Sequence, residues 1–238
     1  MRKFQEKHEV LFAVLWIVLY CVVMGSLKGA FGYGSVWPTL GLAAIAAGIT
    51  VFVKVNHLED KYGLAHWPKN MKQLLWLIPL WVLATGNLWD GISLSYHGAA
   101  MLWAVLSMML VGYVEEMLFR GFLFRGMLSG EKAVVAVVVS ARTFGMGHII
   151  NLFTGQGGFE TLMQVIFAVA LGFLFTMVAF KGGSLIPCII AHAMIDVFAL
   201  FGADTETGDW FSFGTTVVVS IVYCLYLRHL ETPKEAHT

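Results

Sequence analysis

Apolar runs of about twenty residues recur along the whole chain, and short polar segments separate them. A helix needs about 20 mostly apolar residues to cross the hydrocarbon core of a bilayer. Eight stretches approach this length, at roughly residues 9–27, 36–55, 73–93, 98–120, 132–152, 162–181, 185–203 and 212–230. Backbone groups in lipid must be hydrogen-bonded within the protein, and the alternating pattern of a transmembrane barrel is absent, so these runs predict helices.

The composition supports an integral membrane protein. Hydrophobic residues make up 58% of the 238 residues and charged residues only 13%, with a mean hydropathy of +0.77. Soluble domains carry about 25% charged residues. No repeat, low-complexity stretch or long linker divides the chain. We therefore predict an all-α polytopic protein in which about eight transmembrane helices form a single domain over residues 1–238 and enclose a polar intramembrane cavity.

The basic residues are unevenly distributed although the formal net charge is zero. If the predicted helices alternate in direction, all 15 lysines and arginines fall on one side except Lys28 and Arg142. The residues on that side are Arg2, Lys3, Lys7, Lys54, Lys61, Lys69, Lys72, Arg120, Arg125, Lys132, Lys181, Arg228 and Lys234. The other side carries the acidic residues Asp90, Glu160, Asp204, Glu206 and Asp209. The positive-inside rule then predicts a multi-pass cell-membrane protein with cytoplasmic N- and C-termini.

Three of the predicted helices carry ionisable residues inside their apolar runs, in the segments 115–120, 144–148 and 192–196. Each such residue costs roughly 2.5 to 3.5 kcal/mol on insertion scales, so it indicates a functional site. At 1.5 Å per residue, Glu115 and His148 lie about 21–26 Å from the turn that joins their helices, and His192 lies about 14 Å from its own turn. These depths predict one shared cavity that is reachable from the cytoplasm.

The first segment contains two adjacent carboxylates with different surroundings. Glu115 and Glu116 point about 100° apart on a helix. Glu116 precedes Arg120 by four residues, which is the favourable order for an ion pair within a helix. This pairing leaves Glu115 to face the cavity, where it could act as a general base. The alternative is a solvated helix end at the membrane surface.

The other two segments each place a histidine at helical spacing from a second residue. His148 follows Phe144 by four residues, and Gly145 and Gly147 allow close approach of a backbone or a substrate. His192 shares a helix face with Asp196, which could hold the imidazole in one tautomer. The alternatives are a packing hydrogen bond for His148 and a buried cross-link between helices for the second pair.

Residue types and spacing favour activation of a water molecule. No serine lies in a nucleophile-elbow context, no cysteine has a histidine at helical spacing, and HExxH is absent. Glu115 could take a proton from water while a histidine donates to the oxyanion of a peptide bond. The same residues could instead bind zinc, with Glu115, His148, His192 and Asp196 as ligands.

The order Glu115-Glu116-x-x-x-Arg120, Phe144-x-x-x-His148 and His192-x-x-x-Asp196 resembles the three signature motifs of the CAAX protease and bacteriocin-processing family. This family, also called CPBP or Abi, includes the type II CAAX prenyl endopeptidases, and the resemblance covers about residues 110–200. It implies an intramembrane endopeptidase in which Glu115 activates water and His148 and His192 assist. The third motif of the prenyl proteases ends in Asn. An ionised Asp196 accepts hydrogen bonds but cannot donate them, which suggests that it orients a histidine.

The resemblance implies supporting or substrate-binding roles for the remaining motif residues, Glu116, Arg120, Phe144 and Asp196. We expect no cofactor, with zinc as the alternative. The expected partners are a peptide or membrane-protein substrate and the lipid bilayer, and not nucleic acid. Two other functions remain open: a non-enzymatic immunity or signalling protein that binds a peptide in this cavity, and a proton-coupled transporter. Transporters usually show related halves or broken helices, which the sequence lacks.

Overall fold

A computed structural model describes residues 1–203 and 205–232 of the chain. Asp204 and Lys234, which contribute to the predicted charge asymmetry, lie outside these residues. The described part is helical, and its only strand-like pairing is a single bridge between Ile92 and Gly202. The α-helices are α1 (Arg2–Lys7), α2 (Glu9–Phe31), α3 (Val36–Val55), α4 (Ile78–Ala84), α5 (Ala99–Glu116), α6 (Arg125–Leu128), α7 (Ala133–Gly147), α8 (Gly158–Gly182), α9 (Ile186–Ala199) and α10 (Glu206–Leu227).

Each of the eight predicted apolar stretches contains a helix, which confirms an all-α polytopic membrane protein. Within the described residues, six helices are long and apolar enough to cross a membrane. They cover Glu9–Phe31, Val36–Val55, Ala99–Leu128, Ala133–Phe153, Gly158–Gly182 and Gly208–Leu227. The other two, Leu75–Ala84 and Ile186–Ala199, are shorter than the predicted 73–93 and 185–203.

The short third helix has a local backbone cause. Leu75, Trp76 and Leu77 have positive φ angles of 50°, 53° and 59°, a conformation that is costly for residues with a large side chain. Regular α-helix therefore begins only at Ile78, with Pro79 in its first turn, and it ends before Gly86. The apolar run predicted a longer helix because hydrophobicity does not report these dihedral angles.

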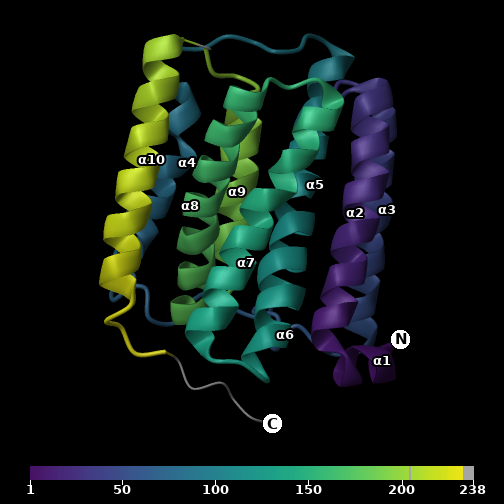
Figure 1. Cartoon of the computed structure of the whole chain (residues 1–238), viewed down its shortest axis with the longest axis vertical. Coiled ribbons are helices and arrows are strands. Elements are labelled where there is room, and N and C mark those ends of the chain that lie inside the picture. The colour runs from purple at the N-terminus through teal and green to yellow at the C-terminus, as the bar shows by residue number, and fades with distance from the viewer. Residues whose placement is uncertain (204, 233–238) are drawn as a thin grey trace.

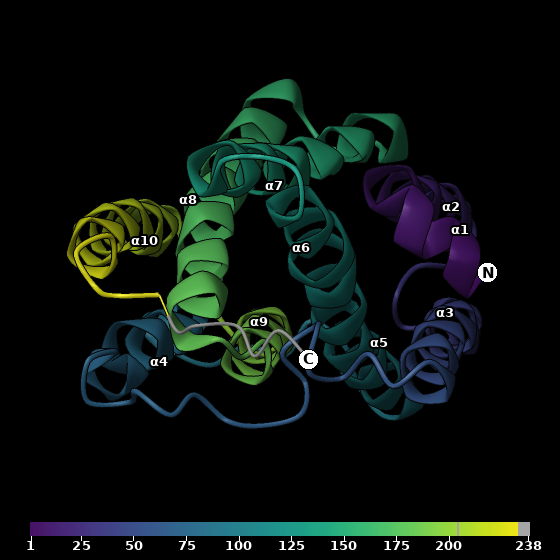
Figure 2. The same ribbon diagram turned by 90° about the horizontal axis from the view of Figure 1, so that it is seen from below.

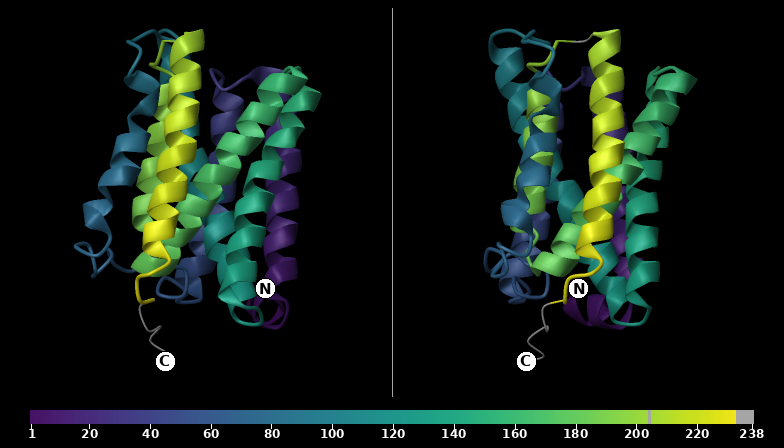
Figure 3. Two further views of the ribbon diagram at one scale, coloured as in Figure 1. Left: turned by 60° about the vertical axis from the view of Figure 1, so that its left-hand side comes forward. Right: turned by 90° about the vertical axis from the view of Figure 1, so that its left-hand side faces the viewer.

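The axes of the long helices lie roughly along the long axis of the molecule, and α1 and the C-terminal end of α10 lie at the same end (Figure 1). Seen from below, α2 and α3 form one side, α4 and α10 form the opposite side, and α5, α7, α8 and α9 lie between them (Figure 2). Two side views show the same arrangement (Figure 3). The helix pairs with the most extensive contacts are α7 with α8, α5 with α9, and α8 with α10.

Close backbone approach fixes the central helices. A Cβ atom at Gly112 of α5 would lie 2.6 Å from the backbone nitrogen of Ala193 in α9. At Gly172 of α8, it would lie 2.8 Å from the carbonyl oxygen of Ala141 in α7. Small residues of this kind allow helices to pack tightly in membranes. The first contact holds α5 against α9, and the second holds α7 against α8.

Helix α5 does not continue as a regular α-helix after Glu116. Met117–Phe124 forms a π-helical segment whose eight residues are all buried, and α6 follows it. π-Helical turns are rare and occur frequently at functional sites. Helix α7 likewise ends at Gly147, and a 3₁₀ segment, His148–Thr154, continues the chain. His148 therefore begins this segment and does not lie inside the predicted regular helix 132–152.

Candidate active site

The predicted ion pair between Glu116 and Arg120 is present and fully buried. Arg120 Nη1 donates to Glu116 Oε1 at 2.7 Å, and both side chains are 0% exposed. The alternative of a solvated helix end is therefore wrong. Buried charges require additional partners, and Arg120 also donates at 3.4 Å to Thr176 Oγ1 and to the carbonyl oxygen of Gly172.

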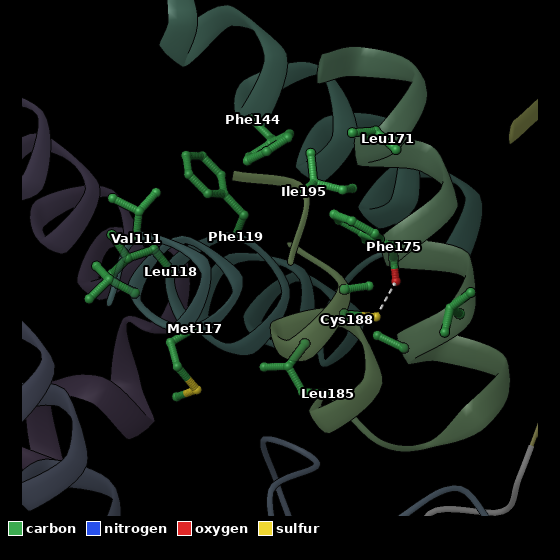
Figure 4. Packing of buried hydrophobic residues seen from close by; sticks show 14 of the residues in the cluster. Val111, Met117, Leu118, Phe119, Phe144, Leu171, Phe175, Leu185, Cys188 and Ile195 are labelled. Carbon is green, nitrogen blue, oxygen red and sulfur yellow. Dashed lines mark hydrogen bonds between the residues drawn. The ribbon is translucent and has the colours of Figure 1, made fainter. Parts of the chain in front are cut away.

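Aromatic rings complete the surroundings of Arg120. The guanidinium carbon lies 4.2 Å from the ring centroid of Phe144 and 5.4 Å from that of Phe175, geometry suited to cation–π attraction. The Phe144 ring also packs edge-on against Phe119 and His192, at centroid distances of 5.3 and 5.6 Å. Figure 4 shows Phe119, Phe144 and Phe175 within the buried core of the molecule. Phe144 thus joins the first and third motifs in space.

His192 connects the three carboxylates of the site. Its Nδ1 lies 2.9 Å from Glu116 Oε1, while its Nε2 lies 3.6 Å from Glu115 Oε2 and 3.5 Å from Asp196 Oδ2. Asp196 does share a helix face with His192, as its spacing predicted. However, the shortest contact, which fixes the ring orientation, comes from Glu116.

Tyr20 of α2 is a member of the site that the sequence did not indicate. Its phenol donates to Glu115 Oε1 at 2.6 Å, and the tyrosine is 7% exposed. A single tyrosine in the first apolar run has no motif around it, and Glu115 lies 95 positions later. The bond occupies one oxygen of Glu115 and leaves Oε2 facing His192.

His148 lines the same cavity but lies apart from the carboxylate cluster. Its Nδ1 lies 3.3 Å from the carbonyl oxygen of Phe144, and its ring packs edge-on against the Phe144 ring at 5.5 Å. The structure therefore joins six of the seven predicted residues directly and links His148 to them through Phe144.

Two further polar residues extend the hydrogen bonds around the buried arginine: Thr176 accepts from Arg120, and Ser140 lies beside Thr176. Ser140 Oγ donates to the carbonyl oxygen of Phe119 at 2.9 Å, and it lies 3.5 Å from Thr176 Oγ1. Thr176 in turn donates to the carbonyl oxygen of Gly172 at 2.7 Å. Isolated hydroxyls in apolar helices usually bond to their own backbone, so the sequence alone gave them no role.

A cavity of about 190 Å³ adjoins the site. Its lining includes Glu115, His148, His192 and Asp196, together with Lys28 and other polar residues. The additional polar lining residues are Tyr20, Tyr33, Asn151 and Gln164. Burial, assisted by the negative charge of Glu115, raises the pKa of the Tyr33 phenol in the loop after α2, so Tyr33 is neutral at physiological pH.

The cavity extends towards the end of the molecule that lies away from the termini, whereas the sequence predicted access from the terminal side. Lys28 is in the last turn of α2, Asn151 follows the end of α7, and Gln164 is near the start of α8. All three helix ends lie away from the termini in Figure 1. The sequence prediction used only the distance of each residue from the turns at the terminal end. That distance does not show towards which end of the molecule the side chains point.

The proposed zinc ligands do not form a ligand set as the structure places them. Across residues 1–203 and 205–232, no group of three or more His, Cys, Asp or Glu side chains is arranged to hold a metal ion. Glu115 and Asp196 both face His192 Nε2, whereas His148 turns its Nδ1 to a backbone carbonyl. We therefore derive no catalytic step through a metal.

Comparison with known protein families gives a match that includes the site. Residues 97–198 match the family described as type II CAAX prenyl endopeptidase Rce1-like. No curated protein matches the chain. The matched segment runs from just before α5 almost to the end of α9, and it contains all seven candidate site residues. Over this segment the chain is similar to the type II CAAX prenyl endopeptidases, which agrees with the resemblance to the CAAX protease and bacteriocin-processing family that its three motifs carry.

Proposed function

We propose that this protein is an intramembrane endopeptidase that hydrolyses a peptide bond in a membrane-associated peptide or protein with water activated by Glu115. The observation that carries the proposal is the position of Glu115. Its Oε1 is held by Tyr20, and its Oε2 lies 3.6 Å from His192 Nε2 beside a cavity. A carboxylate that is oriented but still accessible is suited to take a proton from water.

Glu116 and Arg120 support this chemistry by orienting His192. Arg120 Nη1 donates to Glu116 Oε1, and the same oxygen accepts a hydrogen bond from His192 Nδ1–H. This leaves Nε2 directed towards Glu115 and Asp196. An imidazole lone pair would repel two carboxylates, so one proton is shared among Nε2, Glu115 and Asp196.

The shared proton suits the second half of the reaction. Glu115 removes a proton from the attacking water as oxygen adds to the peptide carbonyl carbon. The C–N bond then breaks, and the leaving amine takes a proton from the Glu115–His192–Asp196 group. Asp196 stabilises the imidazolium form of His192 as the proton moves, which is the usual role of a carboxylate beside a catalytic histidine.

His148 is proposed to bind the peptide carbonyl from the other wall of the cavity. If its Nδ1–H bonds to the Phe144 carbonyl, its Nε2 can donate to a developing oxyanion only when the ring is protonated. Aromatic packing against Phe144 fixes the plane of the ring. We therefore assign His148 the stabilisation of negative charge and Glu115 the activation of water.

The test is peptide cleavage by purified protein in lipid nanodiscs, followed by mass spectrometry. Candidate substrates come from comparing membrane peptides of cells with and without the protein. Replacing Glu115 with Gln preserves shape but removes the base, so we expect turnover to fall by about 100-fold or more. Glu131→Gln, an exposed change in the turn before α7, is the matched control and should remain active. Full activity of Glu115→Gln would refute the proposed base.

The same assay separates the other functions and the metal alternative. A peptide-binding immunity or signalling protein would bind candidate peptides without cleaving them in either variant. A zinc peptidase would lose activity on chelation and regain it with zinc, because a metal-bound water would be the nucleophile. The proposed mechanism predicts activity that chelators leave unchanged.

A further inference from the structure

Lys28 occupies an unusual position for a basic residue in this chain. Most other lysines and arginines lie at the end that carries the termini, whereas Lys28 is in the last turn of α2 at the opposite end. A lysine at a helix end in a membrane commonly extends to the headgroups, which keeps its charge in water. Lys28 instead turns inward, where it is half-buried and lines the cavity.

A chain of amide side chains fixes the Lys28 ammonium group. Lys28 Nζ donates to Asn151 Oδ1 at 3.0 Å, and Asn151 Nδ2 donates to Gln164 Oε1 at 2.8 Å. Gln156 Nε2 donates to the same Gln164 oxygen at 3.1 Å. Asn151 is 7% exposed, so this support is buried within the protein. The amides come from the 3₁₀ segment, the loop after it and α8, which together position one cation.

Lys28 forms no ion pair with an acidic residue in the part of the chain that the structure describes, and its Nζ lies 5.6 Å from the centroid of the Tyr33 ring. No Asp or Glu oxygen lies within 4.0 Å of Nζ, although other lysines such as Lys54 and Lys61 form ion pairs. An ammonium group has three donors, and Asn151 takes one of them. Because Lys28 lines the cavity, the other two N–H donors of its ammonium group are available to a bound ligand.

Helix geometry gives the spacing along α2 between Lys28 and Tyr20, the residue that holds the proposed base. Tyr20, which bonds to Glu115, and Lys28 are eight residues apart on α2, so their Cα atoms are separated by about 12 Å along the helix axis. An extended peptide advances about 3.3 Å per residue. A substrate with its scissile bond at Glu115 would therefore reach Lys28 about three or four residues away.

We propose that Lys28 is a specificity-determining residue that binds a carboxylate of the substrate about three or four residues from the scissile bond. The proposal rests on the proposed peptidase function for the location of the scissile bond. A carboxylate complements the cation, and the amide chain orients it in advance, which lowers the cost of binding. The carboxylate can belong to an acidic side chain or to the C-terminus of the peptide.

Binding to the catalytically disabled Glu115→Gln protein tests this assignment without requiring cleavage. The probe is a pool of alanine–leucine octapeptides that carry an uncharged boron-dipyrromethene dye at the N-terminus, and the protein is held in nanodiscs. The pool is made in four forms, which have an Asp or an Asn at one position and a free or an amidated C-terminus. Fluorescence anisotropy then gives the Kd for each form and identifies the source of the carboxylate.

We expect at least one carboxylate form to bind about tenfold or more tightly than the uncharged form. A difference of this size is typical of one hydrogen bond to a charged group. Adding Lys28→Met should abolish this preference, and Lys28→Arg should retain it. Lys72→Met, an exposed change near the terminal end, is the matched control and should also retain it. Equal affinities for all four forms, no binding by any form, or a preference that survives Lys28→Met would overturn the assignment.

Cleavage assays distinguish failure of this inference from failure of the proposed function. Cleavage without any carboxylate preference would refute the role of Lys28 alone. A carboxylate preference that depends on Lys28, in a protein that cleaves no peptide, would refute the peptidase and leave the binding site.

Discussion

Glu116 illustrates how one buried oxygen can organise a site. Its Oε1 accepts hydrogen bonds from both Arg120 and His192, while its Oε2 is buried without a hydrogen-bond partner in the described part of the protein. Such a carboxylate is costly to bury unless it is paired. Because Arg120 compensates its charge, Glu116 can fix the His192 ring while Glu115 remains available for the reaction.

Tyr20 is expected to act as a positioning residue for Glu115. Tyr20→Phe removes the 2.6 Å hydrogen bond and retains the ring, so the carboxylate can rotate away from His192. A hydrogen bond to a charged group contributes about 1.5–3 kcal/mol, so kcat should fall by about 10- to 100-fold with little change in KM.

The control for Tyr20→Phe is Tyr113→Phe on α5. The Tyr113 phenol lies 2.8 Å from Thr50 Oγ1, away from the cavity lining. Initial-rate kinetics on one peptide would separate kcat from KM in both variants. If both changes reduced kcat equally, or if Tyr20→Phe raised only KM, Tyr20 would not position the base.

Residue contacts were predictable from the sequence where they are local. The pair Glu116 and Arg120 followed from four-residue helical spacing, which fixes which side chains meet. Tyr20, Lys28 and Thr176 were not predictable, because their partners lie 56 to 123 positions away in the sequence. A single polar residue in an apolar run has no periodic pattern from which its partner could be predicted.

At the scale of helices, the contact between α5 and α9 sets the distance between the first and third motifs. Glu115 and Glu116 end α5, and His192 is in α9, one residue before Ala193. Gly112 faces that residue so closely that any side chain would push the helices apart. The contacts of His192 with Glu115 and Glu116 therefore depend on Gly112, although Gly112 itself takes no part in these contacts.

We expect Gly112→Ala to reduce both stability and activity. Its Cβ would lie 2.6 Å from the Ala193 nitrogen, and overpacking of this kind typically costs about 1–3 kcal/mol. Gly214→Ala in α10, where a Cβ meets nothing within 4 Å, is the matched control. Tryptophan fluorescence during thermal unfolding, together with peptide cleavage, would measure both effects. Identical behaviour of the two variants would show that the contact does not position α9.

The helices themselves were predictable from hydrophobicity, but their interruptions were not. Apolar runs require backbone hydrogen bonding in lipid, so each predicted stretch contains a helix. The π-helical segment 117–124 and the change to a 3₁₀ segment at His148 depend on which carbonyl each N–H meets. Neither segment is marked by a proline, so the sequence gave no signal for a break at these positions.

At the scale of the whole molecule, the basic residues gather at one end and the cavity extends towards the other. The basic residues of α1, of the loop between α3 and α4, and of the turn before α7 lie at the terminal end, while the cavity extends to the other end. If the terminal end is cytoplasmic, as the positive-inside rule predicts, the Lys28 end of the cavity faces the opposite side of the membrane.

Cysteine labelling in intact cells would test this orientation. His66 lies in the exposed loop before α4 at the terminal end, and Ser93 is exposed in the segment between α4 and α5 at the other end. A membrane-impermeant maleimide should label Ser93→Cys directly and His66→Cys only after permeabilisation. The unmodified chain, whose Cys21, Cys188 and Cys224 are buried or half-buried, provides the background signal. Labelling of His66→Cys but not Ser93→Cys in intact cells would reverse the orientation and place the Lys28 end of the cavity on the cytoplasmic side, so that substrates carrying the proposed carboxylate would be sought among cytoplasmic segments.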